Sequence, residues 1–333
     1  MNWTTVAAVI LLSKAFVNMI SHHYAFFLCM RVTAGMVELL LWSNMNITSH
    51  VRVGTCSWKY DSWRGLIYPE SGPLNYLGEY SRCYNTVEVD QWFWSLFAGN
   101  KVVLPRSDTV REYNESVPDT FVFGIKVPNS ITLTHFYKKT SKEPLEQNPH
   151  FLSLDLLKRF LETIEPLGKM IGPLIFQFEY LNKKKMSGQA EFVELLADFF
   201  DDAPKGYTYC LEIRNPNYLN EIYFKLLREK KINPVFLHGY YMPSIFEVYK
   251  QYQDYVGEGC VIRLHGRHRE EIEKETNKNW SRIVMPQDKD LRQLSAMLED
   301  LESRGVPTFL FVNNHFEGSA PTTIVRIQEV LDS

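Results

Sequence analysis

Two pairs of charged residues could do chemistry because of their types and their spacing. Glu212 and Arg214 lie two residues apart in one apolar segment, and Arg263 and His265 lie two residues apart in another. A carboxylate or an imidazole can transfer a proton, and a guanidinium can bind an oxyanion through two parallel hydrogen bonds. The pattern therefore predicts acid–base chemistry on an anionic ligand.

The catalytic candidates are Glu212, His265 and Glu88, which all come at or near the ends of apolar segments. We expect Glu212 to act as a general acid or base. His265 is expected to carry a proton or to stabilise an oxyanion. Taken singly, each residue is more often a satisfied polar group than a catalyst, so the hypothesis depends on their common position.

The ligand-binding candidates are basic and amide side chains at the ends of apolar segments or in the loops that follow. They are Lys126, His135, Gln177, Arg214, Arg263, Asn313, Asn314 and His315. Arg214 and Arg263 are expected to clamp the anion, while Asn313 and His315 orient the substrate.

These residues sit on a regular alternation of predicted strands and helices. The strands are predicted at 51–56, 86–90, 121–127, 173–178, 208–214, 233–238, 260–265 and 308–313. Helical patterns lie between them, near 74–83, 107–115, 151–166, 188–202, 219–230, 243–254, 288–303 and 321–331. Eight alternations over about 280 residues predict an α/β fold, a TIM (β/α)8 barrel that is regular or locally irregular. An open doubly wound sheet would need a glycine-rich phosphate-binding turn, and the sequence has none.

Side chains alternate along a strand, so Glu212 and Arg214 share the face opposite Leu211 and Ile213. The apolar face must meet the helices, and the charged face then points into the barrel. Burying ionised groups costs several kcal/mol each unless they are paired. One interpretation is a structural ion-pair network. A ligand site is favoured, because these residues gather at the strand ends where barrel enzymes place their active sites.

The long irregular segments 128–150 and 266–287 both follow predicted strands, so we expect them to cover the mouth of the barrel. Basic residues at Lys126, Lys183–Lys185 and Arg267–Arg269 would ring the same mouth. The net charge of −3 argues against a DNA-coating protein. A locally basic mouth predicts an anionic partner, either a small molecule with a phosphate or carboxylate or a nucleic-acid backbone.

The cofactor is left open by the sequence. The five cysteines are widely spaced and no C-x-x-C occurs, which indicates neither a disulfide framework nor a thiolate zinc site and favours a cytoplasmic protein. A divalent metal is an alternative, because suitable ligand types are present but without a local ligand motif such as H-E-x-x-H. The suitable residues are His135, His265, His315, Glu88 and Glu212.

Residues 1–44 differ from the rest of the chain. Their apolar runs are interrupted, for example by Lys14, and none reaches the roughly 20 apolar residues of a membrane span. We therefore divide the chain into a hydrophobic extension, 1–44, and a barrel domain, 45–333. The extension is either non-native, with Met45 as the true start, or membrane-associated, or part of the fold. Membrane contact is expected only if it is native.

Several motifs beyond Val51 resemble one family in combination. They are Gly54-Thr-Cys-Ser-Trp58, Trp63-Arg-Gly65, Tyr68-Pro69, Thr86-Val-Glu-Val-Asp90, Lys126-Val-Pro128, Thr134-His135, Glu212-Ile-Arg214, Arg263-Leu-His-Gly266 and Asn313-Asn-His315 with Gly318 and Ala320-Pro321. The chain resembles the YecE-like family (domain of unknown function 72), and this resemblance implies a TIM-barrel fold. Asp90 and Trp94 stand where the family usually has Asn and Tyr, and Ile283 and Met285 stand where aromatics are usual. The family has no established reaction, and its likeness to endonuclease-IV-like enzymes and sugar isomerases concerns the fold alone.

Three function hypotheses follow from the sequence. The leading one is an enzyme, a hydrolase or an isomerase, that binds an anionic, phosphate-bearing substrate at the C-terminal mouth of the barrel. The second is a protein that binds nucleic acid, with or without phosphodiester cleavage. The third is a non-catalytic sensor of a small ligand.

Overall fold

Eight parallel strands form the barrel of the computed structural model, which describes residues 48–97, 101–138 and 142–333. The strands are β1 (Val51–Thr55), β2 (Thr86–Val89), β5 (Val122–Lys126), β6 (Ile171–Gln177), β7 (Tyr209–Glu212), β8 (Asn233–Gly239), β9 (Cys260–Gly266) and β10 (Thr308–Val312). Their order in the sheet is β1-β10-β9-β8-β7-β6-β5-β2, with each neighbouring pair parallel. The predicted TIM-type barrel is confirmed, and each predicted strand lies within a few residues of its observed position.

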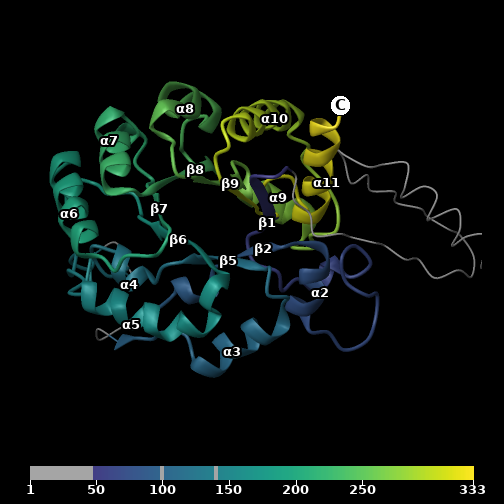
Figure 1. Ribbon diagram of the computed structural model, residues 1–333, viewed down its shortest axis with the longest axis horizontal. Coiled ribbons are helices and arrows are strands. Elements are labelled where there is room, and N and C mark those ends of the chain that lie inside the picture. The colour runs from purple at the N-terminus through teal and green to yellow at the C-terminus, as the bar shows by residue number, and fades with distance from the viewer. Residues whose placement is uncertain (1–47, 98–100, 139–141) are drawn as a thin grey trace, which may run out of the picture. The chain divides into compact units, whose positions relative to one another are not determined.

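Helices follow the strands and surround the barrel (Figure 1). They are α2 (Tyr76–Cys83), α3 (Ser107–Ser116), α4 (Asn129–Thr132), α5 (Leu154–Ile164), α6 (Gln189–Asp202), α7 (Glu221–Lys230), α8 (Ile245–Tyr252), α9 (Arg269–Thr276), α10 (Asp288–Ser303) and α11 (Ala320–Leu331). The prediction that 128–150 and 266–287 are irregular was wrong in part. The first contains α4 and the second contains α9, which is polar and therefore lacked the apolar periodicity that identified the other helices.

Local sequence explains where several helices begin. The side chain of Ser153 accepts a hydrogen bond from Leu156 N at the start of α5. Asn220 does the same for the backbone N–H groups of Ile222 and Tyr223 at the start of α7. Such caps satisfy N–H groups that have no partner within the helix. A short antiparallel pair, β3 (Leu96–Phe97) with β4 (Lys101–Val102), lies between β2 and α3 and was not predicted.

The barrel closes between β1 and β2. Cys56 and Glu88 form an isolated parallel bridge there, and the N–H of Ser57 donates to the carbonyl oxygen of Glu88 at 3.1 Å. Gly54 permits the close approach, because a Cβ at this position would lie 2.1 Å from the carbonyl oxygen of Thr86. The closure therefore brings Cys56 and Glu88 together at the C-terminal ends of the first two barrel strands.

The interior of the barrel has an apolar layer below the polar strand ends. Its buried cluster consists of Cys56, Ile175, Cys210, Val235, Val261 and Phe311. Alternation along β7 and β9 then points Glu212 and Arg263 into the barrel above Cys210 and Val261. On the opposite face of the strands, Phe176 packs against Phe199 and Phe200 of α6. The prediction that the charged face points inward is thus confirmed by the packing of these two strands.

Among the described residues, no helix has the length and apolar character needed to cross a bilayer. The predicted hydrophobic extension, residues 1–44, lies outside the described residues.

Candidate active site

A buried arginine organises the polar layer at the C-terminal ends of the strands. Arg263 is only 1% exposed. Its Nε and Nη2 atoms donate to the two carboxylate oxygens of Glu88 at 2.6 and 2.7 Å. Its Nη1 atom donates to Gln177 at 3.1 Å and also to Glu212. These four hydrogen bonds use most of the five N–H donors of the guanidinium. Arg263 was expected to bind a substrate anion. In the structure its donors bind carboxylates of the protein instead.

Glu212 links this buried arginine to a second one nearer the surface. Its carboxylate is fully buried, and Arg263 and Arg214 hold its pKa below the usual range against the opposing effect of burial. A carboxylate that stays ionised between two guanidinium groups is suited to positioning them. Proton transfer, the role expected of Glu212 from the sequence, is not favoured by this environment.

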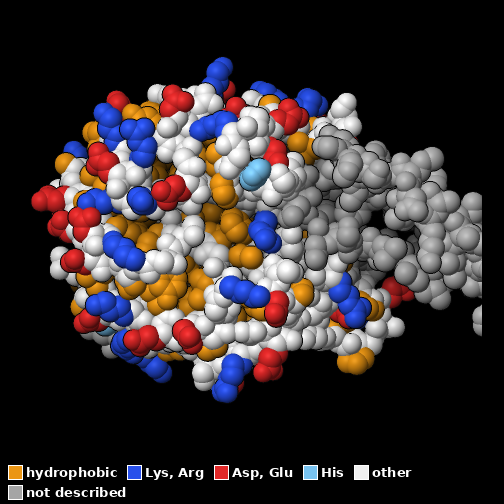
Figure 2. Space-filling view, in the orientation of Figure 1, with side chains coloured by type: hydrophobic (Ala, Val, Ile, Leu, Met, Phe, Trp, Pro, Cys, Tyr) orange, Lys and Arg blue, Asp and Glu red, His pale blue; other side chains and the backbone are white. Residues whose placement is uncertain are grey.

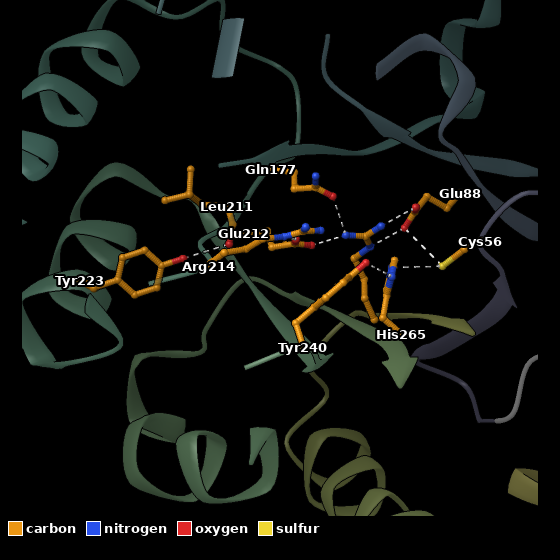
Figure 3. Close-up of polar contacts among 10 residues, drawn as sticks. Cys56, Glu88, Gln177, Leu211, Glu212, Arg214, Tyr223, Tyr240 and His265 are labelled. Carbon is orange, nitrogen blue, oxygen red and sulfur yellow. Dashed lines mark hydrogen bonds and ion pairs between the residues drawn. The ribbon is translucent and has the colours of Figure 1, made fainter. Parts of the chain in front are cut away.

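Arg214 is the arginine that faces the mouth. Its Nε atom donates to Glu212 at 3.2 Å, and its guanidinium lies over the ring of Tyr240 at 4.6 Å. The side chain is 25% exposed. No described residue accepts a hydrogen bond from its Nη1 or Nη2 atoms. Figure 3 shows Glu88, Gln177 and His265, from different strands, converging on Glu212 and on Arg214, which follows Glu212 in the same segment.

Lys126 is a second cation of the mouth, and unlike Arg214 it has no paired carboxylate among the described residues. Its side chain is 8% exposed, and Nζ lies 3.9 Å above the ring of Phe93. No described carboxylate is within salt-bridge distance of Nζ. Burial, followed by the repulsion of Arg263, lowers the pKa of Lys126 to about 8. Burial also raises the pKa of Asp90, which together with Glu88 attracts the ammonium.

His265 lies next to the closure of the barrel. Burial and the positive charge of Arg263 lower the pKa of its imidazole well below the ordinary value, which keeps it neutral at neutral pH. Its Nε2 atom is 3.8 Å from the sulfur of Cys56. Its Nδ1 atom is 3.5 Å from the hydroxyl of Tyr240. A neutral imidazole can accept a proton or ligate a metal.

The loop after β10 carries the remaining candidates. His315 contacts Asn313 through Nδ1 at 2.7 Å and Glu273 of α9 through Nε2 at 2.8 Å. Its charge would act on His265, so the two imidazoles share one region. Asn314 differs from these two residues, because it is buried and its side-chain oxygen accepts a hydrogen bond from Ala320 N. We therefore correct the assignment of Asn314 from ligand contact to loop support at the start of α11.

His135 is buried in the segment after β5, where its Nδ1 atom lies 3.0 Å from the hydroxyl of Thr134. Burial and nearby Lys185 lower its pKa. Lys185 is itself paired with Glu179 at 2.6 Å. Arg269 pairs in the same way with Glu273. The basic residues that were expected to ring the mouth are thus accompanied by carboxylates.

Three residues of the site were missed by sequence reasoning. Cys56, Phe93 and Tyr240 each touch a candidate residue through sulfur or through a ring. Cys56 and Tyr240 follow predicted strands, so a search of all residues at strand ends would have included them. Phe93 belongs to a short 3-10 helix (Gln91–Phe93), and no pattern in the sequence connects it with Lys126.

The family of the chain follows from comparison with known proteins. The model of the family "Protein of unknown function DUF72" matches residues 52–333. The chain belongs to this family. The resemblance found in the sequence motifs is thereby confirmed. No curated protein matches the chain.

Two solved structures of DUF72 family proteins have the same fold. One, from Thermotoga maritima, is 22% identical, covers 85% of this chain and 99% of its own, and has a TM-score of 0.58. Another, from Enterococcus faecalis, is 18% identical, covers 85% of this chain and 96% of its own, and also has a TM-score of 0.58. Identities this low show the fold alone, so the function has to be argued from the site.

Proposed function

We propose that this DUF72 protein is an enzyme that binds a small anionic, phosphate-bearing substrate at the C-terminal mouth of its barrel. The observation that carries the proposal is that the guanidinium of Arg214 is held in place but still has free donors within the described part of the chain. Its Nη atoms have no protein acceptor among the described residues, while Glu212 and Tyr240 fix the plane of the guanidinium. A planar guanidinium held in one orientation presents two parallel donors to a phosphate or carboxylate.

Lys126 and His265 would supply the chemistry beside the bound anion. An ammonium whose pKa lies near 8 can add positive charge to the anion site and can also give up its proton close to neutral pH. The imidazole of His265 is a weak base because its pKa is lowered, so it would hydrogen-bond to the substrate and would not take this proton. Proton transfer on a phosphorylated substrate is the chemistry of both isomerases and hydrolases.

Calorimetric titration tests this function. We expect phenyl phosphate to bind and phenol to bind far more weakly, because phenol lacks the anion. Arg214→Lys keeps the charge but loses the bidentate fork, so the dissociation constant should rise on the order of 10-fold. Arg228→Lys is the matched control, because Arg228 also stacks on a tyrosine, Tyr255, but on α7. Equal affinities for phenol and phenyl phosphate, or unchanged binding in Arg214→Lys, would contradict the proposal.

A second candidate function, binding of single-stranded nucleic acid, is favoured by the exposed aromatic side chains. Among the described residues, the exposed aromatics all lie in the segments after β2, β5, β6 and β8. They are Trp94, Phe97, Tyr137, Tyr180, Tyr240 and Tyr241. Bases stack on such rings with little sequence preference.

Charge separates the two candidates. The face drawn in Figure 2 shows Lys and Arg interspersed with Asp and Glu around a hydrophobic middle, which is not the extended basic track of a nucleic-acid groove. A single-stranded oligonucleotide that contacts Z phosphates should show an affinity that falls with salt at a slope of about −0.7Z. A steep fall of oligonucleotide affinity with salt would favour the nucleic-acid function. A shallow fall of phenyl phosphate affinity with salt would favour a site for a single small anion.

A further inference from the structure

A thiol, a carboxylate and an imidazole meet where the barrel closes. The donor atoms of Cys56, Glu88 and His265 all lie within 4.8 Å of one another. The sulfur of Cys56 is 3.8 Å from Oε2 of Glu88 and 3.8 Å from Nε2 of His265. Figure 3 shows these three side chains directed toward one another. They come from the ends of β1 and β2, the two closing strands, and from β9.

The separations are close to those that a tetrahedral zinc ion imposes on its ligands. Zinc binds sulfur at about 2.3 Å and imidazole nitrogen or carboxylate oxygen at about 2.0–2.2 Å. In a tetrahedron these lengths place the sulfur about 3.5–3.6 Å from the other two donors. The two sulfur separations exceed this by only a few tenths of an ångström. The third separation, between Glu88 and His265, is no more than 4.8 Å, so side-chain movements would close the triad around an ion.

Neighbouring residues hold two of the three ligands in the orientation that a metal needs. Arg263 donates to both oxygens of Glu88, which orients the carboxylate and leaves lone pairs on Oε2 for an ion. The Tyr240 hydroxyl lies 3.5 Å from Nδ1 of His265, so it can accept a hydrogen bond from the Nδ1–H group and leave Nε2 free for an ion. Metal-binding histidines and carboxylates generally have such supporting partners.

We propose that Cys56, Glu88 and His265 form a binding site for one divalent transition metal, with zinc favoured by the sulfur, nitrogen and oxygen donors. Three protein ligands leave the fourth position to water or to a ligand, as in catalytic zinc sites. The inference does not depend on the proposed anion site, since metal binding is measured without any substrate.

The charges around the triad are of both signs. Glu88, Asp90 and Arg263 act on Cys56, and the cations Lys126 and Arg214 lie in the same layer. When the ion binds, the Cys56 thiol loses its proton to solvent and the sulfur forms the bond to the metal. The bound ion therefore adds one net positive charge, which an oxyanion or hydroxide in the fourth position would neutralise.

Titration of the metal-free full chain with Co(II) tests the site, because cobalt replaces zinc and absorbs light. We expect one cobalt per chain, with a thiolate-to-cobalt charge-transfer band in the near ultraviolet and tetrahedral d–d bands in the visible. Cys56→Ala should abolish the charge-transfer band and weaken cobalt binding by more than about 100-fold, which is the upper end for losing a mere supporting partner. Cys56→Ser, which nearly keeps the volume, serves if the alanine variant does not fold.

Two control variants separate this thiol from the others. Cys210 belongs to the same buried interior cluster as Cys56 but lies outside the triad, so Cys210→Ala should keep the band. Cys29→Ala removes a thiol outside the described residues and should also keep it. The proposal is overturned if no cobalt binds to the wild-type chain. A charge-transfer band that survives in a folded Cys56 variant overturns it equally.

Discussion

Two arginines at neighbouring levels of the barrel mouth have opposite environments. Arg263 is 1% exposed and donates to Glu88, Gln177 and Glu212. Arg214 is 25% exposed and, among the described residues, its side chain donates only to Glu212. Both follow the same strand-end pattern in the sequence, and both point inward. The comparison teaches that depth decides the role, because the deeper guanidinium must be paired to be buried while the outer one can leave donors for a ligand.

The largest expected effect comes from removing the deeper arginine. Arg263→Met leaves Glu88 and Glu212 buried without their common partner, and breaking a buried pair costs roughly 3–5 kcal/mol. We expect the free energy of unfolding to fall by about that amount in denaturant titrations at pH 7. A loss below ~1 kcal/mol would break the comparison, because it would make Arg263 as dispensable as a surface arginine.

A smaller effect, which depends on pH, is expected at Lys126. Its ammonium loses the proton as the pH rises through about 8, so a doubly charged anion such as sulfate should bind more weakly above that pH. Lys126→Arg keeps its charge and should bind sulfate with little change between pH 7 and pH 9, because guanidinium does not titrate there. Calorimetric titrations at both values check the prediction. Equal pH dependence in the two proteins would show that Lys126 is not part of the anion site.

Stability should respond to the same titration with a defined sign. The folded pKa of Lys126 lies below its ordinary value of 10.5. Between about pH 8 and 10.5 the unfolded chain holds a proton that the folded chain has released, so stability rises with pH in this window. Against a Lys126→Met variant, the wild type should gain on the order of 1.4 kcal/mol per pH unit there. The lowered pKa of Lys126 is contradicted if the difference in unfolding free energy between the two proteins stays constant over this pH range.

The smallest effect is expected from deleting residues 1–44. The eight strands lie between Val51 and Val312, and the family match begins at residue 52. The fragment 45–333 keeps Thr48 and Ser49, whose hydroxyls donate to Glu302. We expect its melting temperature and its anion affinity to equal those of the full chain. An insoluble fragment would show that the extension belongs to the core and would limit the comparison to the full chain.

The fold could be predicted from the sequence because its signals are local. Apolar runs such as Phe309–Val312 and the amphipathic pattern of α5 can be recognised without knowing what they pack against. The alternation along β7 and β9 also predicted which charged side chains point inward. The polar helix α9 lacked such a signal and was missed.

The roles within the site could not be predicted, because they depend on contacts between distant strands. Two arginines in similar sequence contexts differ only in how many acceptors surround each guanidinium, and those acceptors come from β2, β6 and β7. Cys56 likewise becomes a candidate metal ligand only because Glu88 and His265, which are remote in the sequence, lie next to it. Sequence motifs for metal sites require ligands that lie close together in one segment. The three residues of this triad come from three different strands, so no motif indicated them.

The central claim is that Arg214 is the anion-binding arginine and Arg263 the structural one. The most direct test is the melting temperature with and without phenyl phosphate for the wild type, Arg214→Gln and Arg228→Gln. Any general effect of the anion on stability is common to all three proteins. The account predicts a rise on the order of 2 °C at tenfold excess over Kd in the wild type and Arg228→Gln, and no rise in Arg214→Gln. An equal rise in all three proteins would contradict it.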